Sequence, residues 1–278
     1  GSSASTISTA GGSNSSLHLA ANADNVVRGF NVANVNNSPA ADLTVSAVLA
    51  NSSSNAAFVS GLEKLGAGTM VLSAANTYTG PTNVSAGALL VNGSISTGAV
   101  TVASGATLGG SGTINGATTV SLGGFLSPGE SPGVLTFANG FTVNGTYTWE
   151  VDQLADAAAG VNFDQIRLTG GSGVFNNASF SFSFGSGLAP NVSNSSFWNV
   201  DQSWVVVNNT GLGSVSGSFA AIDNSPWASK GSFSLGFGGG PGGDVTLTWS
   251  AIPEPSSFAA FAGLGAVAFA GLRRRRRA

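Results

Sequence analysis

An apolar residue recurs at every sixth position from Leu72 onward, and this spacing constrains the fold more than any other feature of the chain. Six residues are too many for one helical turn and too many for simple strand alternation. About three such segments per coil predict a β-solenoid, in which each coil stacks on the one before. The alternative is a β-sandwich whose hairpins happen to keep even spacing. The register comprises Leu72, Tyr78, Val84, Leu90, Val102, Leu108, Ile114, Val120 and Leu126, with Ser96 as its polar member.

Glycine and the other small polar residues support an all-β fold. Charged residues make up only 8% of the chain, against about 25% in an average globular domain. The polarity comes from Ser, Thr, Asn and 41 Gly, which suit turns and the solvent faces of strands. We expect the glycines between ladder residues to supply corners with positive φ. They include Gly80, Gly87, Gly93, Gly105 and Gly112.

The charges are divided unequally along the chain. Residues 1–250 carry four basic and eleven acidic groups, whereas the segment after them carries one glutamate and five arginines. The body therefore has few cations to neutralise phosphates, and nucleic-acid binding is not expected. Cysteine is absent, which excludes disulfides and thiolate metal sites and is compatible with export.

The pattern changes along the chain in four stages. Residues 1–60 form a β-rich segment that we expect to belong to the solenoid, and residues 61–133 carry the solenoid repeat. Residues 134–250 are rich in aromatics and alternate strongly. They are either wider final coils or a separate C-terminal β cap with sandwich-like strands. Residues 251–278 form a distinct tail.

Three motifs in residues 61–93 resemble an autotransporter-associated β-strand repeat. They are Lys64-Leu65-Gly66-Ala67-Gly68-Thr69, Asn76-Thr77-Tyr78-Thr79-Gly80 and Ser85-Ala86-Gly87. The resemblance implies a right-handed parallel β-helix in the passenger of an exported protein. Because the chain begins at Gly1 without a signal segment, we expect it to be the C-terminal part of a longer exported protein, or a precursor whose signal peptide is missing.

The tail combines an extended motif, an apolar run and a basic cluster. Pro253-Glu254-Pro255 precedes the run 258–272, and Arg273, Arg274, Arg275, Arg276 and Arg277 follow it. A helix over 256–272 would rise about 26 Å, which is short but usable for a bilayer core of about 30 Å. We therefore predict one short transmembrane helix. The five arginines should stay in the cytoplasm and place the body outside.

This order of parts resembles the PEP-CTERM sorting signal. The resemblance implies recognition by an exosortase, a membrane cysteine protease, and cleavage at or near Pro253, Glu254 and Pro255. It also implies a precursor anchored in the inner membrane of a Gram-negative-type bacterium. The body would then pass to the cell surface or to an exopolysaccharide matrix. A permanent C-terminal anchor is the alternative reading of the same segment.

Little in the sequence points to catalysis, and we expect no enzyme activity, no cofactor and no metal site. The single histidine, His18, lies in an apparent strand, where a solvent-facing role is expected. Glu150, Asp152 and Asp164 could act on glycosides or hold calcium, but solvated carboxylates are the default. A β-helix polysaccharide lyase is the enzyme alternative. The four cations of the body are too scattered to favour it.

A structural or adhesive surface protein is the expected function, with polysaccharide binding as the alternative. Tryptophans stack on sugars when they are exposed, although strand tryptophans more often fill cores. Trp198 and Trp227 lie outside clean alternation. They are therefore the candidates for carbohydrate stacking. The segment Gly238 to Gly243 matches a nucleotide-binding pattern literally, but a strand follows it, so we interpret it as a loop.

Overall fold

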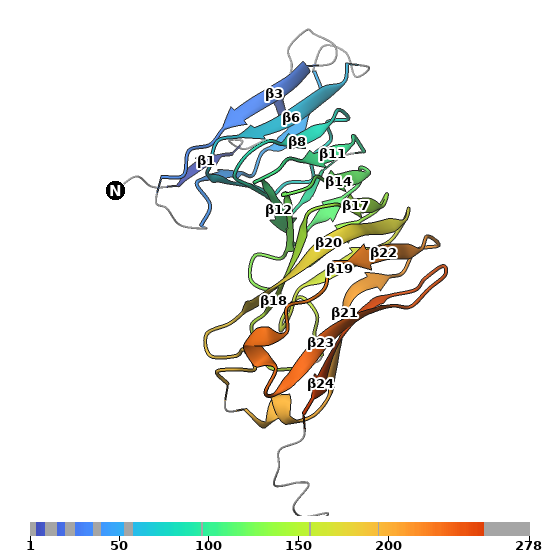
Figure 1. The fold of residues 1–278 in the computed structure, drawn as a ribbon. Coiled ribbons are helices and arrows are strands. Elements are labelled where there is room, and N and C mark those ends of the chain that lie inside the picture. The colour runs from blue at the N-terminus through green and yellow to red at the C-terminus, as the bar shows by residue number, and fades with distance from the viewer. Residues whose placement is uncertain are drawn as a thin grey trace, which may run out of the picture.

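The computed structural model describes residues 4–8, 16–19, 26–35, 40–52, 58–95, 97–155, 157–193 and 195–252. The body is elongated, and its strands stack along the long axis (Figure 1). Within these residues the regular structure consists of strands and two short 3-10 helices, η1 (Ser196–Asn199) and η2 (Ser225–Trp227). The predicted all-β class is confirmed.

Three faces run along the body, and each is built mainly of parallel strands. The first face contains β1 (Ser5–Ile7), β4 (Leu43–Val45), β7 (Thr69–Leu72), β9 (Ala88–Val91), β12 (Thr107–Gly110), β15 (Phe125–Pro128), β18 (Thr146–Val151) and the second half of β20 (Gly173–Phe184). The second face contains β3 (Val26–Asn31), β6 (Ser60–Leu65), β8 (Thr82–Val84), β11 (Val100–Val102), β14 (Thr118–Val120), β17 (Phe141–Val143), the first half of β20 and β22 (Val215–Phe219). The third face contains β10 (Ser94–Ile95), β13 (Thr113–Ile114), β16 (Val134–Phe137), β19 (Gln165–Leu168), β21 (Gln202–Asn209), β24 (Val245–Ala251) and β23 (Gly231–Phe237).

Strand β20 belongs to both the first and the second face, so these two faces form one 15-stranded sheet. A separate parallel pair joins β2 (Ser16–His18) to β5 (Val48–Ala50).

Successive coils are in register along the first face. Leu89 lies opposite Leu108, and Leu108 lies opposite Leu126, so one coil takes 19 or 18 residues. Each of these coils contributes one strand to every face, as the six-residue spacing predicts. The parallel pairing excludes the sandwich alternative, because a sandwich is built from antiparallel sheets. The right-handed sense of the coil stays a prediction.

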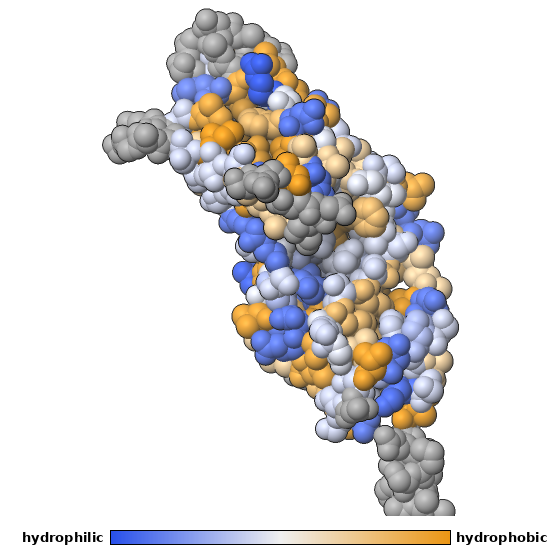
Figure 2. Space-filling view, turned by 90° about the vertical axis from the view of Figure 1, so that its left-hand side faces the viewer, coloured by the Kyte–Doolittle hydropathy of each residue, from blue (hydrophilic) through white to orange (hydrophobic). Residues whose placement is uncertain are grey.

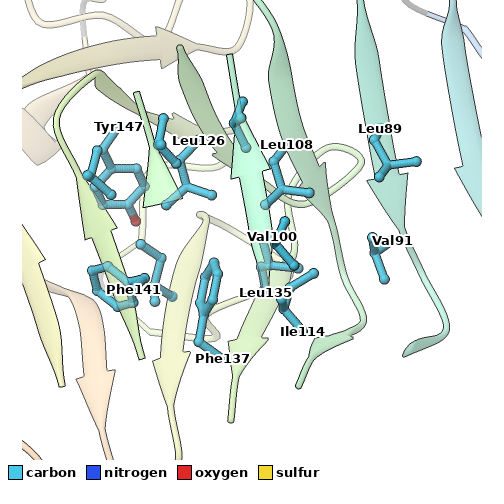
Figure 3. Packing of buried hydrophobic residues seen from close by; sticks show 14 of the residues in the cluster. Leu89, Val91, Val100, Leu108, Ile114, Leu126, Leu135, Phe137, Phe141 and Tyr147 are labelled. Carbon is cyan, nitrogen blue, oxygen red and sulfur yellow. The ribbon is translucent and has the colours of Figure 1, made fainter. Parts of the chain in front are cut away.

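The core is a set of ladders made by inward side chains, seen in close-up in Figure 3. Eight of the nine apolar residues predicted to face inward are buried, and Leu90 is the exception. Leu89 and Val91 are buried in its place. The corner between Val84 and Leu89 is one residue shorter than six, with Gly87 at a φ of 64°. Strand β9 therefore points Leu89 and Val91 toward the core, in place of Ala88 and Leu90. Ser96 lies outside the described residues.

The corner glycines serve two different purposes. Gly87 and Gly105 have positive φ, 64° and 78°, as predicted. Gly80, Gly93 and Gly112 do not, and that part of the prediction is wrong. A Cβ at these three positions would come within 2.0–2.4 Å of a carbonyl oxygen of a neighbouring coil. They are glycines because successive coils approach closely there.

The coils widen toward the C-terminal end. Leu135 pairs with Ile166, and Ile166 pairs with Val207, so the coil grows to 31 and then 41 residues. Aromatic side chains replace aliphatic ones in the wider interior. The second-face ladder runs Val102, Val120, Val143, Phe175, and the first-face ladder runs Leu108, Leu126, Tyr147, Phe180.

The third face ends in strands of reversed direction. Strand β24 lies between β21 and β23 and pairs antiparallel with both. The sequence left open whether the aromatic region forms wider coils or an antiparallel cap. The structure contains both, since β16 to β22 continue the parallel stacking and β23 and β24 cover its end.

Candidate functional site

Lys64, the first residue of the repeat motif, ties together the corners of two coils. Its side chain is buried, and its ammonium donates to the carbonyl oxygens of Leu65, Gly66 and Ala86 at 3.0, 2.8 and 3.0 Å. Leu65 and Gly66 belong to its own corner, whereas Ala86 belongs to the next coil. Burial lowers the pKa of Lys64 to about 8, against the attraction of the Asp42 carboxylate.

Asp42 fixes the same corner from the preceding coil. Its two carboxylate oxygens accept from the backbone N–H groups of Thr69 and Val35 at 2.9 and 3.0 Å. These hydrogen bonds, that from Thr69 first, hold the pKa of the carboxyl below its usual range. A Cβ on Gly68 would lie 2.8 Å from the carboxylate. The Ala33 carbonyl oxygen would lie closer still, at 2.5 Å, so the glycine of the motif is required by the backbone of the preceding coil as well as by Asp42.

Asn76, from the second part of the motif, spans three coils with one amide group. Its Oδ1 accepts from the backbone N–H of Leu49 at 2.8 Å. Its Nδ2 donates to the carbonyl oxygens of Ala74 and Ser94 at 3.0 and 2.9 Å. The polar motif residues thus supply partners to corner groups such as the Leu49 N–H and the Gly66 and Ala86 carbonyl oxygens, and they add a second hydrogen bond to the carbonyl oxygens of Leu65, Ala74 and Ser94.

An open groove of about 740 Å³ runs along the outer side of the first face. Its lining extends from Thr69 on β7 through Thr107 and Ser127 to Ser183 on β20, with Glu130 and Glu150 near that end. Figure 2 shows this side of the body, where pale and blue residues are interspersed with orange ones. This groove was not predicted from the sequence. The sequence feature that could have predicted it is the recurrence of Ser and Thr at the outward positions of these strands.

A buried carboxyl group supports the floor of the groove at its acidic end. Asp164 accepts from the backbone N–H groups of Gly133 and Glu150 at 2.9 and 3.1 Å. Desolvation, with a smaller contribution from the charge of Glu150, raises the pKa of Asp164 to about 8. The side chain of Glu150 accepts from the Ser131 hydroxyl at 3.1 Å. The carboxyl group of Asp164 therefore holds its proton more tightly than an exposed aspartate does.

The other candidate chemical groups are dispersed. Asp152 is exposed just after β18, beyond its neighbour Glu150. His18 is exposed on β2, where its ring contacts the Ser16 hydroxyl and the carbonyl oxygen of Asn51. Across the described ranges, no group of three or more His, Cys, Asp or Glu side chains could hold a metal ion. The segment Gly238 to Gly243 is the loop between β23 and β24, as predicted.

Trp198 is a core residue, and the prediction that it stacks on a sugar is wrong. Its side chain is 1% exposed, and its indole N–H donates to the carbonyl oxygen of Leu188 at 2.8 Å. Helix η1, which carries Trp198, folds over the last coil. There the Trp198 ring packs against Trp204, Phe233 and Trp249.

Trp227 is also enclosed. It is 8% exposed, and its indole N–H donates to the side-chain oxygen of Asn224 at 2.9 Å. Its ring lies between Phe182, Phe184 and Phe233. Trp198 is fully enclosed, whereas the small exposed part of Trp227 lines an open pocket of about 240 Å³ with Phe182 and Phe184.

The body ends immediately before the sorting motif. Ile252, the last described residue, donates its backbone N–H to the carbonyl oxygen of Lys230 at 2.7 Å. Pro253, Glu254, Pro255 and Arg273 to Arg277 lie outside the described residues, as does the predicted transmembrane helix. No helix within the described ranges combines the length and apolar character that crossing a bilayer requires.

Two protein-family models match parts of the chain. Residues 62–91 match the passenger-associated transport repeat, and residues 251–277 match the PEP-CTERM protein-sorting motif. Both matches agree with the resemblances carried by the motif residues. No curated protein matches the chain. The sorting motif marks an exported protein that an exosortase processes, with a precursor that passes through the membrane of a Gram-negative-type bacterium.

Proposed function

We propose that this chain is a non-catalytic structural or adhesive protein of the cell surface or the extracellular matrix. In the precursor, the tail spans the inner membrane and Arg273 to Arg277 hold its end in the cytoplasm. An exosortase then cuts at or near Pro253-Glu254-Pro255, and the body moves to the surface or matrix.

The main support for a non-catalytic role is that the buried polar side chains bind the backbone of the solenoid. Lys64, Asn76 and Asp164 are buried and bind backbone groups of their own and neighbouring coils. Buried and engaged in this way, they are not available to a substrate. A chain that commits these groups to stacking is suited to persistence as a scaffold.

The boundary between body and tail supports the sorting step. Strand β24 is paired on both sides, and Ile252, at the end of the described residues, donates a further backbone hydrogen bond. Loss of the chain from Pro253 onward would remove none of these hydrogen bonds. The body is therefore built to survive removal of its tail.

Replacement of Pro253, Glu254 and Pro255 by alanine in the native host tests the sorting proposal. The variant should accumulate as a slightly larger, membrane-bound form, measured by intact mass and cell fractionation. Alanines at Ser256 and Ser257 provide a matched control that should be processed normally. Unchanged mass and location of the triple variant would refute the proposal.

Polysaccharide binding is the second candidate, and the groove on the first face favours it. The groove is open, long and lined by hydroxyl groups. Incubation of the protein with acidic and neutral polysaccharides separates binding from catalysis. The non-catalytic proposal predicts retention of polymer without release of shorter products. Shorter products would support the lyase or hydrolase alternative.

A further inference from the structure

We propose that the groove on the first face binds a polysaccharide chain that carries free amino groups, with Glu130 and Glu150 holding an amino group at one end. The inference deepens the polysaccharide-binding candidate and rests on export, because only an exported chain meets such polymers. It depends on four features of the groove: its free hydroxyls, its length, its charge and its paired backbone.

Free hydroxyl groups line the groove from several of its strands. Thr107, Ser127 and Ser183 line it from β12, β15 and β20. Within the part of the chain that the structure describes, the hydroxyls of these three residues have no protein hydrogen-bond partner. Each can donate and accept one hydrogen bond or more. Free hydroxyls distributed over several strands suit a ligand with repeated polar groups.

The length of the groove favours a chain over a single sugar. Its lining comes from six neighbouring strands, β7, β9, β12, β15, β18 and β20. Neighbouring strands lie about 4.8 Å apart, so the groove extends over about 24 Å. Small residues, including Ala88 and Gly105, leave room along its length. An oligosaccharide of several rings fits this extent.

The charge of the groove selects among polysaccharides. Glu130 and Glu150 are its ionisable lining residues, and no Lys or Arg is among the described residues that line it. Ser131 donates to one oxygen of Glu150 and orients that carboxylate. Two carboxylates without a cation repel uronate polymers and attract an ammonium group. Amino sugars supply such a group on an otherwise neutral, hydroxyl-rich chain.

A basic peptide is the competing ligand for an acidic groove, and the backbone of the first face argues against it. Peptides that bind as added strands use free N–H and C=O groups at a sheet edge. The groove lies over the face of the sheet, where strands such as β12 and β15 pair on both sides. It offers side-chain hydroxyls rather than unpaired backbone groups.

Calorimetric titration of the purified full chain in detergent tests the proposal. The probe is a β-linked glucosamine hexamer, compared with its fully N-acetylated counterpart, an oligogalacturonate and an oligolysine of equal length. The glucosamine hexamer should bind at least tenfold more tightly than each of the other three. Equal binding of the acetylated hexamer, tighter binding of oligolysine, or no binding of the glucosamine hexamer would each overturn the proposal.

Two variants locate the site. Glu130→Gln combined with Glu150→Gln should weaken glucosamine binding at least tenfold, whereas Glu63→Gln on the second face should leave it unchanged. Ala88→Trp fills the groove without changing its charge and should also weaken binding at least tenfold. A circular dichroism spectrum checks the fold of each variant. Unchanged affinity in both groove variants would overturn the assignment of the site. Processing of the tail is measured separately, so failure here leaves the sorting proposal untouched.

Discussion

The backbone N–H of Ile252 donates to the carbonyl oxygen of Lys230 at 2.7 Å, and the next residue is Pro253 of the sorting motif. One residue earlier, the N–H of Ala251 donates to the Asp201 carboxylate at 2.8 Å. The folded cap and the protease motif therefore adjoin without a linker. A protease that binds residues upstream of the motif as an extended strand must first separate them from the strands that pair with β24.

Insertion of a six-residue Gly-Ser spacer between Ile252 and Pro253 should speed processing in the native host. The spacer frees residues upstream of the motif that β24 otherwise keeps paired on both sides. Pulse-labelling followed by separation of precursor and product measures the rate. The same spacer between Gly239 and Gly240, in the open β23–β24 loop, is the control. Equal rates for the two insertions would contradict this expectation.

Replacement of Lys64 by methionine should destabilise the solenoid by about 3 kcal/mol. The substitution leaves the carbonyl oxygens of Gly66 and Ala86 without their donor, whereas that of Leu65 still accepts from the Val32 N–H. Each buried unsatisfied group costs about 1–3 kcal/mol. Urea unfolding followed by β-sheet circular dichroism measures the loss. The control is Lys230→Met. Lys230 is half-buried and lies shortly after η2, and its replacement should change stability by about 0.5 kcal/mol or less. Similar midpoints for the two variants would show that the corner does not need the ammonium.

Replacement of Asn76 by alanine should cost about 2–3 kcal/mol. One side chain there satisfies backbone groups in three coils, so its removal weakens two coil interfaces together. The comparison is Asn115→Ala, which removes a single hydrogen bond to Ile95 and should cost about 1 kcal/mol. Both values come from urea midpoints. A smaller effect at Asn76 than at Asn115 would be incompatible with the bridging role.

The stability of the body should fall as pH rises from about 4 to about 8. The pKa of Asp164 is about 8 in the folded protein and near 3.8 when unfolded, so the unfolded chain releases this proton first. Over that window the folded state binds more protons, and linkage gives a slope of up to about 1.4 kcal/mol per pH unit. Above about pH 8 the contribution of Asp164 to stability no longer changes with pH.

The Asp164→Asn variant isolates this effect. Asparagine cannot ionise, and its side-chain oxygen can still accept from Gly133. The variant should therefore lack the difference between pH 4 and pH 8 that the unchanged protein displays in thermal unfolding. A persistent difference in the variant would assign the pH dependence to other groups.

The sequence predicts the solenoid well where its coils are short. Val84, Val102, Val120 and the rest of the ladder keep nearly constant spacing because each coil repeats the same three corners. Leu90 fails because one corner at Gly87 is shorter, and a change of one residue reverses which side chains of a strand face inward.

The candidate site was harder to predict. Trp198 and Trp227 lie in short helices without alternation, so their burial depends on packing between distant segments. The groove depends on the pairing of distant residues, such as Glu150 opposite Ser183. Such pairing is fixed by loop lengths that the local sequence does not reveal.

Because the short coils keep a constant register, the length of the body is proportional to the number of coils. Leu89, Leu108 and Leu126 stand directly above one another, so one more unit of 18 or 19 residues would add one rung. Each rung extends the body by about 4.8 Å. Gene duplication within this segment could thus adjust how far the molecule reaches in small, equal increments, without any redesign of its core.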